Sequence, residues 1–355
     1  MEIHIKRMAN RVLYFHKAND FTGSTRALAN SIGEEPAVVI TITPGEKGLL
    51  SEMPNIKLLK IPYPKYKNRS IPFISFVISY IGRVVQTILN AGKYDVFYIN
   101  TIAPFYAAII GRMFGKRIIY HIHEKIINPG VTYKIAEKVF YRTPSYTIYV
   151  SNYLKNSYPD KAGAYLIQYN KLSADFLQEV KIRPLVDRPL KTILMVSSLS
   201  KAKGVDTFVK IASMLSDLDF HLVLSVDQAA IDNYFVEIPH NLTIDPSQNH
   251  LAAVYYNADL LLNLTMPSVC IETFGLTILE AMAYGIPAIV PNVGGPTELV
   301  VDEENGYCVE VEDVDKVVGA INLALTPQNY ARLCENTIRR FNHLYEKNIN
   351  SSIYI

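Results

Sequence analysis

The sequence predicts an α/β protein built from two doubly wound domains in tandem, and three observations support this fold class. Short apolar runs alternate with segments of helical periodicity, and the alternation restarts in the second half of the chain. Apolar strands separated by helices are typical of a parallel sheet covered on both faces. At roughly 150 residues per domain, 355 residues correspond to two domains.

The first half of the chain is expected to form an N-terminal Rossmann-like domain over residues 1–175. Its predicted strands are Val12–His16, Val38–Ile42, Ile56–Ile61, Asp95–Asn100, Ile118–Ile122 and Thr147–Val150. Apolar residues at helical spacing predict helices over Thr25–Ile32 and Phe73–Leu89. In such sheets ligands bind at the carboxyl ends of the strands.

The second half repeats the pattern and is expected to form a C-terminal Rossmann-like domain over residues 190–328. The predicted elements are the strands Thr192–Val196, Phe220–Ser225, Asp259–Leu264 and Ala288–Val290 and the helices Val205–Leu215 and Gly275–Tyr284. Residues 176–189 lack clean periodicity and carry two prolines, which predicts a linker. Residues 329–355 are expected to form a helix that packs back on the first domain. The two domains are expected to face a cleft in which ligands bind.

Composition excludes several classes of protein. A chain with 49% hydrophobic and 19% charged residues is neither disordered nor fibrous. Three cysteines without paired spacing exclude a disulfide scaffold and a cysteine zinc site, and fit a reducing compartment. Residues 1–11 lack a signal-peptide pattern, and the apolar run Ile71–Ile81 is shorter than the roughly 20 residues that a membrane span needs. We therefore expect a cytoplasmic protein, at most peripheral on the inner face of the cell membrane.

The net charge of +2 hides an asymmetry between the halves of the chain. Residues 1–175 carry 23 Lys and Arg against 11 Asp and Glu, whereas residues 176–355 carry 12 against 22. The split indicates either that the basic half faces an anionic partner or that the two domains attract each other.

The segment Glu272–Glu298 (ETFGLTILEAMAYGIPAIVPNVGGPTE) is the most informative part of the sequence. A predicted helix begins after Phe274-Gly275, and the free N–H groups at a helix start favour a phosphate. Glu272 precedes this point, and Glu280 lies about 7.5 Å further along the helix at 1.5 Å per residue. Carboxylates can accept hydrogen bonds from the hydroxyls of a ribose or a sugar, although each glutamate alone could also be a solvated residue.

This segment resembles the donor-site motif of retaining glycosyltransferases of the GT-B fold, the large group 1 family that includes sucrose synthase and many bacterial polysaccharide, O-antigen and capsule enzymes. The family motif has two glutamates seven residues apart, a helix of small residues, Gly-Gly and another glutamate, all of which are present here. The resemblance implies that Glu280 holds the nucleotide ribose and Glu272 the transferred sugar. The remaining donor-site residues that it implies are Thr273, Phe274, Gly275, Leu276, Gly294 and Gly295.

Two further loops match the family less closely. In Ser197–Gly204 (SSLSKAKG), Lys203 and Gly204 resemble the Lys-Gly of the diphosphate loop, but Ser198 stands where the family usually has arginine. Lys203 is therefore a predicted diphosphate ligand and catalytic residue, and Lys201 could replace the missing cation.

On the acceptor side, Gly23, Ser24 and Arg26 resemble the family's glycine loop, although a single glycine there can equally mark a plain turn. His121 and His123 share a face at a strand end, and His123 is the better match to a histidine beside the reacting sugar. A strand-end histidine without that likeness is usually structural.

No metal or cofactor is expected. Asp217/Asp219 and Asp313/Asp315 have the spacing of a metal-binding pair, but the second pair precedes a helix predicted at Val317, where aspartate is a favourable cap. Backbone N–H groups and Lys203 would neutralise the diphosphate instead. No Walker loop or dinucleotide fingerprint is present, and no motif supports nucleic-acid binding.

A basic and aromatic segment precedes the predicted helix Phe73–Leu89. Its residues are Lys57, Lys60, Tyr63, Lys65, Tyr66, Lys67 and Arg69. This pattern fits a surface that rests on anionic lipid, or an exposed loop followed by a core helix.

The predicted function is metal-independent, retaining transfer of a sugar from a nucleoside-diphosphate sugar to a glycan or lipid-linked glycan in surface polysaccharide or lipopolysaccharide synthesis. Two alternatives stay open, a nucleotide-sugar epimerase on the same fold and a non-catalytic nucleotide-sugar or glycan-binding protein.

Overall fold

A computed structural model describes residues 11–20, 22–43, 48–59, 72–127, 129–158, 163–182, 190–246 and 251–350. The chain divides into two compact units, each of which is described by itself. The first unit contains residues 1–150 and 154–169, and the second contains residues 151–153 and 170–350. Residues 351–355 lie outside the described residues.

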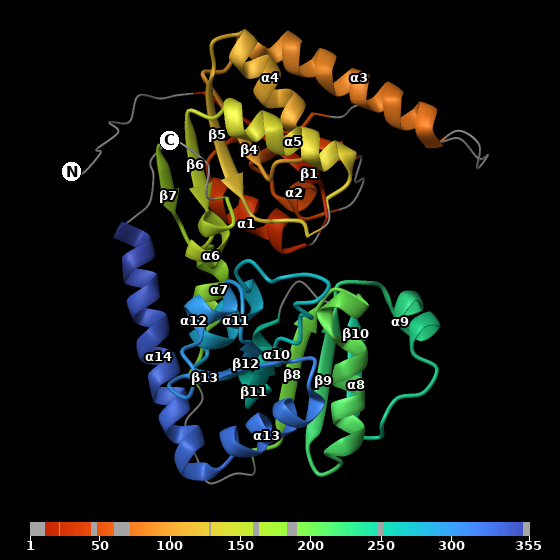
Figure 1. The fold of residues 1–355 in the computed structure, drawn as a ribbon, viewed down its shortest axis with the longest axis vertical. Coiled ribbons are helices and arrows are strands. Elements are labelled where there is room, and N and C mark those ends of the chain that lie inside the picture. Colours follow the sequence, from red (N-terminus) through yellow and green to blue (C-terminus); the bar gives the residue numbers. More distant parts are fainter. Residues whose placement is uncertain are drawn as a thin grey trace. The chain divides into compact units, whose positions relative to one another are not determined.

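The first unit is a seven-stranded parallel sheet with the order β3-β2-β1-β4-β5-β6-β7 (Figure 1). Its strands are β1 Val12–Ala18, β2 Ala37–Thr43, β3 Ile56–Leu58, β4 Val96–Asn100, β5 Arg117–Ile122, β6 Tyr146–Tyr149 and β7 Tyr165–Ile167. The helices of this part of the chain are α1 Gly23–Ile32, α2 Leu49–Glu52, α3 Pro72–Ala91, α4 Phe105–Met113, α5 Val131–Arg142 and α6 Asn152–Asn156. The sequence of β4, Val-Phe-Tyr-Ile-Asn, is buried throughout, as a central strand with both faces covered requires.

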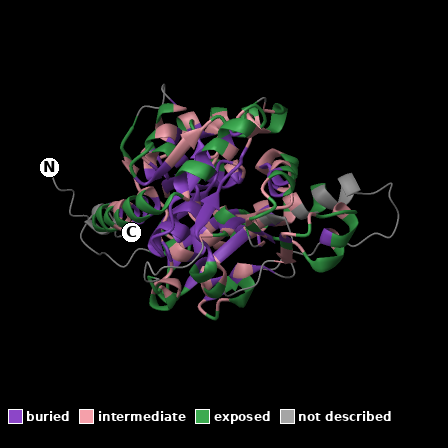
Figure 2. Ribbon diagram, turned by 90° about the horizontal axis from the view of Figure 1, so that it is seen from below, coloured by how far each residue is buried: buried purple, intermediate pink, exposed green. Residues whose placement is uncertain are grey.

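The second unit is a six-stranded parallel sheet with the order β10-β9-β8-β11-β12-β13. Its strands are β8 Thr192–Ser197, β9 Asp219–Leu224, β10 Leu242–Pro246, β11 Leu260–Leu262, β12 Ala288–Pro291 and β13 Gly306–Val309. Its helices are α7 Ala174–Glu179, the 3-10 turn η1 Lys201–Lys203, α8 Val205–Met214, α9 Gln228–Tyr234, α10 Ala252–Asn257, α11 Leu276–Ala283, α12 Pro296–Leu299, α13 Val314–Ala324 and α14 Pro327–Asn350. Figure 2 shows that the strands are mostly buried, whereas the outer faces of the helices are exposed.

Both sheets reverse their strand order at one point, and this positions the functional loops. In the first sheet the reversal lies between β1 and β4, and in the second between β8 and β11. In a doubly wound sheet the loops at such a point diverge and leave a crevice at the carboxyl ends of the strands. The described loops after β1, β4, β8 and β11 are therefore the first places to look for a site.

The structure confirms the predicted fold class of two Rossmann-like α/β domains. The second sheet also has two strands at its edges, β10 and β13, that the apolar pattern did not predict. Both are short and only partly buried, so they lack the continuous apolar run of a central strand.

Several element boundaries differ from the predicted ones by a few residues, and two of the differences concern the predicted linker and a predicted helix cap. Residues 174–179, at the start of the predicted linker, form α7, whose N-cap Ser173 accepts a hydrogen bond from Phe176 N at 3.2 Å. Asp313 caps α13 as predicted, but the helix begins at Val314 instead of Val317. The linker residues 183–189 lie outside the described residues.

Helix α14 packs against α11 and α13 within the second unit. Cys334 and Leu333 of this helix are buried. The expected contact of residues 329–355 with the first domain stays a prediction. No helix among the described residues is long and apolar enough to cross a membrane.

Candidate active site

The loops that follow β8 and β11 are joined by close backbone contacts. Met266 N donates to Ala202 O at 2.8 Å. Gly204 has a φ of +77°, and a Cβ at this position would lie 2.3 Å from Leu264 O. Only glycine combines this left-handed conformation with such a close approach, so Gly204 locks the predicted diphosphate loop against the loop of the first glutamate.

The loop after β12 closes on the same point. Gly295 N donates to Glu272 O at 2.9 Å. A Cβ at Gly294, whose φ is +96°, would lie 2.4 Å from Glu272 O, and a Cβ at Gly295 would lie 2.1 Å from Thr273 O. The glycine pair of the motif is therefore a packing surface for the backbone of Glu272 and Thr273, and three strand ends converge there.

Lys203 and Glu272 form an ion pair at the centre of these loops. Lys203 Nζ lies 2.6 Å from Glu272 Oε2 and 3.5 Å from Thr265 Oγ1. Burial favours the neutral lysine, but the carboxylate of Glu272 outweighs it and raises the pKa of Lys203. Burial likewise favours protonated Glu272, but Lys203 and the backbone N–H groups of Phe274 and Thr273 lower its pKa. Both side chains are therefore charged at neutral pH.

Helix α11 begins directly beside this pair. Its N-cap is Gly275, with a φ of +98°, and no side chain caps the helix. Phe274 is buried, and Leu276 is the first helical residue. An N-terminus that lacks a side-chain cap has donors to offer an anion. Glu272 neutralises the charge of Lys203, so the groups that this corner can offer an anion are the N–H donors at the start of α11 and the remaining protons of the Lys203 ammonium.

Glu280 lies further along α11 and is held by a tyrosine that the sequence analysis did not predict. The carboxylate is buried, and Tyr255 Oη donates to Glu280 Oε2 at 2.5 Å. Tyr255 belongs to α10 and stacks on Tyr284, with ring centroids 5.7 Å apart. No local motif around Tyr255 marks it, since the contact joins residues 25 positions apart.

The last glutamate of the motif has a different environment. Glu298 accepts hydrogen bonds from Asn152 N at 2.9 Å, Asn152 Nδ2 at 2.8 Å and Tyr153 N at 2.6 Å. These partners belong to residues 151–153, which join the second unit although their chain neighbours belong to the first. Glu298 therefore anchors a backbone segment 145 residues away in sequence.

The predicted acceptor-side residues lie in the first unit, at the ends of β1, β4 and β5. Gly23 opens α1, with free space where a Cβ would stand, so packing does not require glycine there. Ser24 O accepts from Asn100 Nδ2 at 3.2 Å, and Arg26 lies within α1. His123 is buried, and its Nε2 lies 2.8 Å from Asn100 Oδ1.

Three histidines gather at these strand ends. The rings of His121 and His123 lie 4.1 Å apart, and His121 Nδ1 lies 2.7 Å from Tyr98 Oη. Burial lowers the pKa of His16 to about 4 and that of His121 to about 3. Burial and the neighbouring His121 and His16 also lower the pKa of His123 well below its usual value. All three rings are neutral in the folded protein at pH 7.

These lowered pKa values predict acid lability of the first unit. The unfolded chain binds protons at histidine below about pH 6.5, whereas folded His16 stays neutral down to about pH 4. The free energy of unfolding should therefore fall between pH 6.5 and 4, by about 1.4 kcal/mol per pH unit for each titrating histidine. Calorimetry of the full chain across this range measures the slope. His121→Phe should reduce it by one histidine's contribution, and an unchanged slope would contradict the assignment.

The structure brings together Lys203, Gly204, Glu272, Thr273, Gly294 and Gly295, with Phe274, Gly275 and Leu276 adjoining them. Ser198 follows β8 directly, and its carbonyl accepts from Ser197 Oγ at 3.1 Å. Among the described residues no group of three or more His, Cys, Asp or Glu side chains could hold a metal ion.

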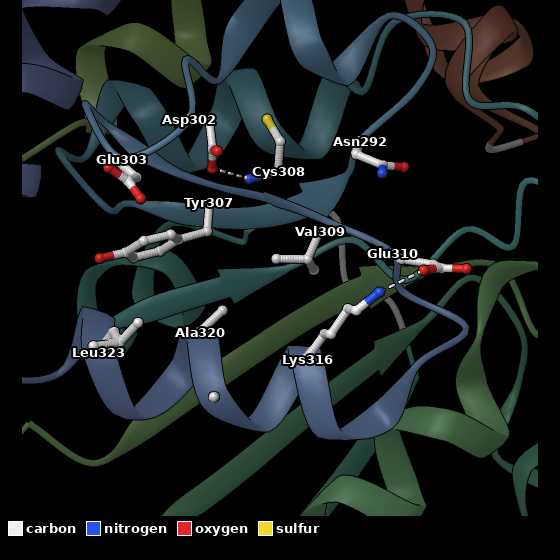
Figure 3. Close-up of a pocket in the computed structure, with 11 residues that line it drawn as sticks. Asn292, Asp302, Glu303, Tyr307, Cys308, Val309, Glu310, Lys316, Ala320 and Leu323 are labelled. Atoms are coloured by element: carbon white, nitrogen blue, oxygen red, sulfur yellow. Dashed lines mark hydrogen bonds and ion pairs between the residues drawn. The ribbon is translucent and has the colours of Figure 1, made fainter.

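A separate pocket of about 440 Å³ lies between β13 and α13 (Figure 3). Its lining includes Tyr307, the ion pair of Lys316 with Glu310 at 2.7 Å, and Asp302, which accepts from Cys308 N at 2.8 Å. None of the predicted site residues lines it. The pocket therefore does not belong to the predicted donor site.

The chain is similar in sequence and in fold to several known proteins. Residues 179–341 match the family model of glycosyl transferases, group 1. A 41.2 kDa protein of the cps region of Klebsiella pneumoniae is 25% identical over 76% of this chain and 73% of its own length. The N-acetyl-alpha-D-glucosaminyl L-malate synthase of Bacillus anthracis is 31% identical over 36% of this chain and 34% of its own length. The chain matches less than half the length of this and two further curated relatives.

Among solved structures, Anabaena Alr3699/HepE in complex with UDP-glucose superposes with a TM-score of 0.78 at 18% identity, over 96% of this chain and 98% of the other. The two sheets and this superposition define a GT-B fold. Residues 179–341, which match the group 1 glycosyl transferase model, include the Lys203–Glu272 loops and α11. The match confirms the resemblance that the sequence carries.

Proposed function

We propose that the chain is a retaining, metal-independent glycosyltransferase that moves a sugar from a nucleoside-diphosphate sugar to a glycan or lipid-linked glycan in surface polysaccharide synthesis. The observation that carries the proposal is the Lys203–Glu272 pair at the uncapped start of α11. Charge builds on the leaving diphosphate as the glycosidic bond breaks. A fixed ammonium and oriented N–H groups stabilise that charge without a metal ion.

The roles that we propose for the individual donor-site residues combine this placement with those that the family resemblance implies. Lys203 and the N–H groups near Leu276 would bind the diphosphate, and Glu272 would accept hydrogen bonds from hydroxyls of the transferred sugar. Glu280, held by Tyr255, would accept from the ribose hydroxyls. The UDP-glucose complex of the Anabaena protein supports a UDP-sugar donor, and the cps-region relative supports a role in polysaccharide synthesis.

A ligand screen tests the proposal. UDP-, GDP- and ADP-sugars are added separately to the full chain, and the melting temperature and the release of nucleotide diphosphate are measured. A donor at a hundred times its dissociation constant stabilises the fold by about 2.7 kcal/mol. Stabilisation by one nucleotide class, with diphosphate release that needs a glycan acceptor, supports the transferase. Conversion of the donor without acceptor indicates the epimerase, and binding without turnover indicates the binding protein.

The buried Tyr255–Glu280 hydrogen bond gives a second prediction. Glu280→Ala should weaken donor binding by about 10- to 100-fold, because each charged hydrogen bond contributes about 1.5–3 kcal/mol. Tyr255→Phe should weaken it by about 3- to 10-fold, since one hydrogen bond that orients the carboxylate is lost. Tyr256→Phe, on the adjacent half-exposed position of α10, is the matched control. Calorimetric titration measures the three affinities, and full affinity of Glu280→Ala would refute the ribose assignment.

The first unit also offers a surface for an anionic membrane, which we include in the proposal. A set of apolar side chains is exposed on α3 and on α4, which packs against it. Its exposed members are Ile78, Ile81, Val85, Ile88 and Leu89 of α3 and Ile109 and Met113 of α4. Arg112 and Lys116 lie within three positions of Met113 in the chain, whereas the predicted basic residues Lys60 to Arg69 lie outside the described residues.

Co-sedimentation with vesicles tests this surface. The full chain should bind vesicles rich in phosphatidylglycerol, because apolar burial and attraction to anionic lipid act together. Ile81→Glu with Leu89→Glu should reduce the bound fraction at least about tenfold, since two charges would enter the headgroup region. Leu323→Glu, at an exposed leucine of the second unit, should have no effect. Equal binding of all three proteins would refute the surface.

A further inference from the structure

A continuous chain of side-chain hydrogen bonds links five residues at the carboxyl ends of β1, β4 and β5. Asp20 Oδ1 accepts from Thr25 Oγ1, which lies 3.1 Å from His16 Nε2. His16 Nδ1 lies 3.0 Å from Asn100 Nδ2, and Asn100 Oδ1 lies 2.8 Å from His123 Nε2. All members except Asp20 are buried. The chain therefore connects a carboxylate on the loop after β1 with the predicted sugar-side histidine.

The direction of every bond in this chain is set by chemistry. An ionised carboxylate only accepts, so the hydroxyl of Thr25 donates to Asp20 and is left to accept from His16 Nε2–H. Thr22 Oγ1 also donates to Asp20, at 2.7 Å, and these bonds lower the pKa of Asp20 although burial acts in the opposite direction. His16 is neutral because burial lowers its pKa. Its Nδ1 therefore carries no proton and accepts from the amide of Asn100.

The orientation of Asn100 has an independent support. Its Nδ2 also lies 3.2 Å from the carbonyl oxygen of Ser24, an atom that can only accept. The NH2 group must therefore face both Ser24 and His16, and Oδ1 must face His123. An amide oxygen cannot donate, so His123 has its proton on Nε2.

We infer that Asp20, Thr25, His16 and Asn100 are positioning residues that hold His123 in the neutral Nε2–H tautomer, with Nδ1 as an acceptor for a sugar hydroxyl. The inference deepens the proposed function, since it rests on the assignment of His123 to the reacting sugar. The opposite tautomer would present a donor at Nδ1 and would lose the bond to Asn100. This chain of hydrogen bonds, which we call the relay, also fixes the plane of the His123 ring, because the Nε2–H of His123 must point at Asn100 Oδ1.

A pair of substitutions at Thr25 separates the relay from ordinary packing. Thr25→Val keeps the shape of the buried side chain but removes the hydroxyl, whereas Thr25→Ser keeps the hydroxyl and removes a methyl group. If only packing mattered, the serine variant would be at least as disturbed as the valine variant. The relay predicts the reverse order, with Thr25→Ser close to the unaltered protein.

The readout that does not depend on activity is the tautomer itself. Long-range ¹H–¹⁵N NMR spectra of the ¹⁵N-histidine-labelled full chain at pH 7.5 distinguish Nε2–H, Nδ1–H and charged rings, with the His123 signals assigned by their loss in His123→Gln. We expect the Nε2–H pattern for His16 and His123 in the unaltered protein and in Thr25→Ser. In Thr25→Val and Asn100→Ala, His123 should show a mixture of both tautomers. An Nδ1–H or charged His123 in the unaltered protein, or no change in either relay variant, would overturn the inference.

Kinetics then connect the relay to transfer. Thr25→Val and Asn100→Ala should lower kcat by about 10- to 100-fold, as for a misplaced positioning group. Their donor dissociation constants should change less than kcat, because the proposed contacts to the diphosphate and the ribose lie in the second unit. If His123→Gln transfers sugar at the full rate while the tautomers behave as expected, the relay stands and the assignment of His123 to the sugar fails. If Thr25→Val and Asn100→Ala keep full kcat although the tautomer of His123 is disturbed, Thr25 and Asn100 have no positioning role in transfer.

Discussion

Replacing Lys203 with alanine is expected to lower the transfer rate by about 10²- to 10³-fold, because one oriented cation beside the leaving diphosphate disappears. The side chain lies 2.6 Å from Glu272 and 3.5 Å from Thr265, so its position is defined before any donor binds. A preorganised charge needs no rearrangement as the bond breaks. The loss should therefore appear in kcat as well as in donor affinity.

The matched control is Lys210→Ala, at an exposed lysine of α8, which should transfer at the unaltered rate. Lys201→Ala tests whether Lys201 supplies the cation that the family's arginine would provide at the position of Ser198. A lower transfer rate of this variant would show that it does. Lys203→Ala also leaves Glu272 as an unpaired carboxylate in a partly buried site, which costs stability. Lys203→Met combined with Glu272→Gln removes both charges and should recover the stability without the activity. A full transfer rate in Lys203→Ala would refute the leaving-group role.

Gly295→Ala is expected to destabilise the second unit by about 3 kcal/mol or more, the upper range for an overpacked interior position. The added Cβ would lie 2.1 Å from Thr273 O and 2.5 Å from Phe274 N, both of which are backbone atoms. A flexible side chain could rotate away, but these atoms move only if the Glu272 loop moves. Since Gly295 has a φ of −60°, alanine is not strained there by its own conformation, and the effect isolates the steric contact.

Gly319→Ala provides the control within the same unit. Gly319 lies on α13 with nothing within 4 Å of an added Cβ, so alanine should stabilise that helix by up to about 1 kcal/mol. Denaturant unfolding of both variants measures the difference, and donor titration should show a weakened affinity for Gly295→Ala alone. Equal stability and affinity of the two variants would mean that the three loops are not in close contact.

The donor motif could be identified from the amino-acid sequence alone. Glu272, Gly275, Glu280 and the glycine pair are near one another in the chain, so their spacing along one loop, helix and turn could be read directly. The match of residues 179–341 to the group 1 family confirms that resemblance. The role of the glycine pair was only partly anticipated. The resemblance implied only that the pair belongs to the donor site, and the structure shows a surface on which another loop packs.

Other contacts could not be predicted because they join distant parts of the chain. Tyr255 reaches Glu280 across 25 positions, Lys203 reaches Glu272 across 69, and Asn100 reaches His16 across 84. No short sequence pattern reveals such pairs, because the two partners lie on different strand ends or helices. Their proximity depends on the order of the strands in the sheet.

The alternation of apolar and helical segments was sufficient to establish two parallel sheets, because burial on both faces leaves a continuous signal in each central strand. The edge strands β10 and β13 escaped prediction, since partial exposure removes that signal. The protonation of His123, the pairing of Lys203 and the anchoring role of Glu298 depend on the packed structure. Periodicity encodes which face of an element is buried, whereas the charge and tautomer of a side chain depend on neighbours that folding brings from elsewhere in the chain.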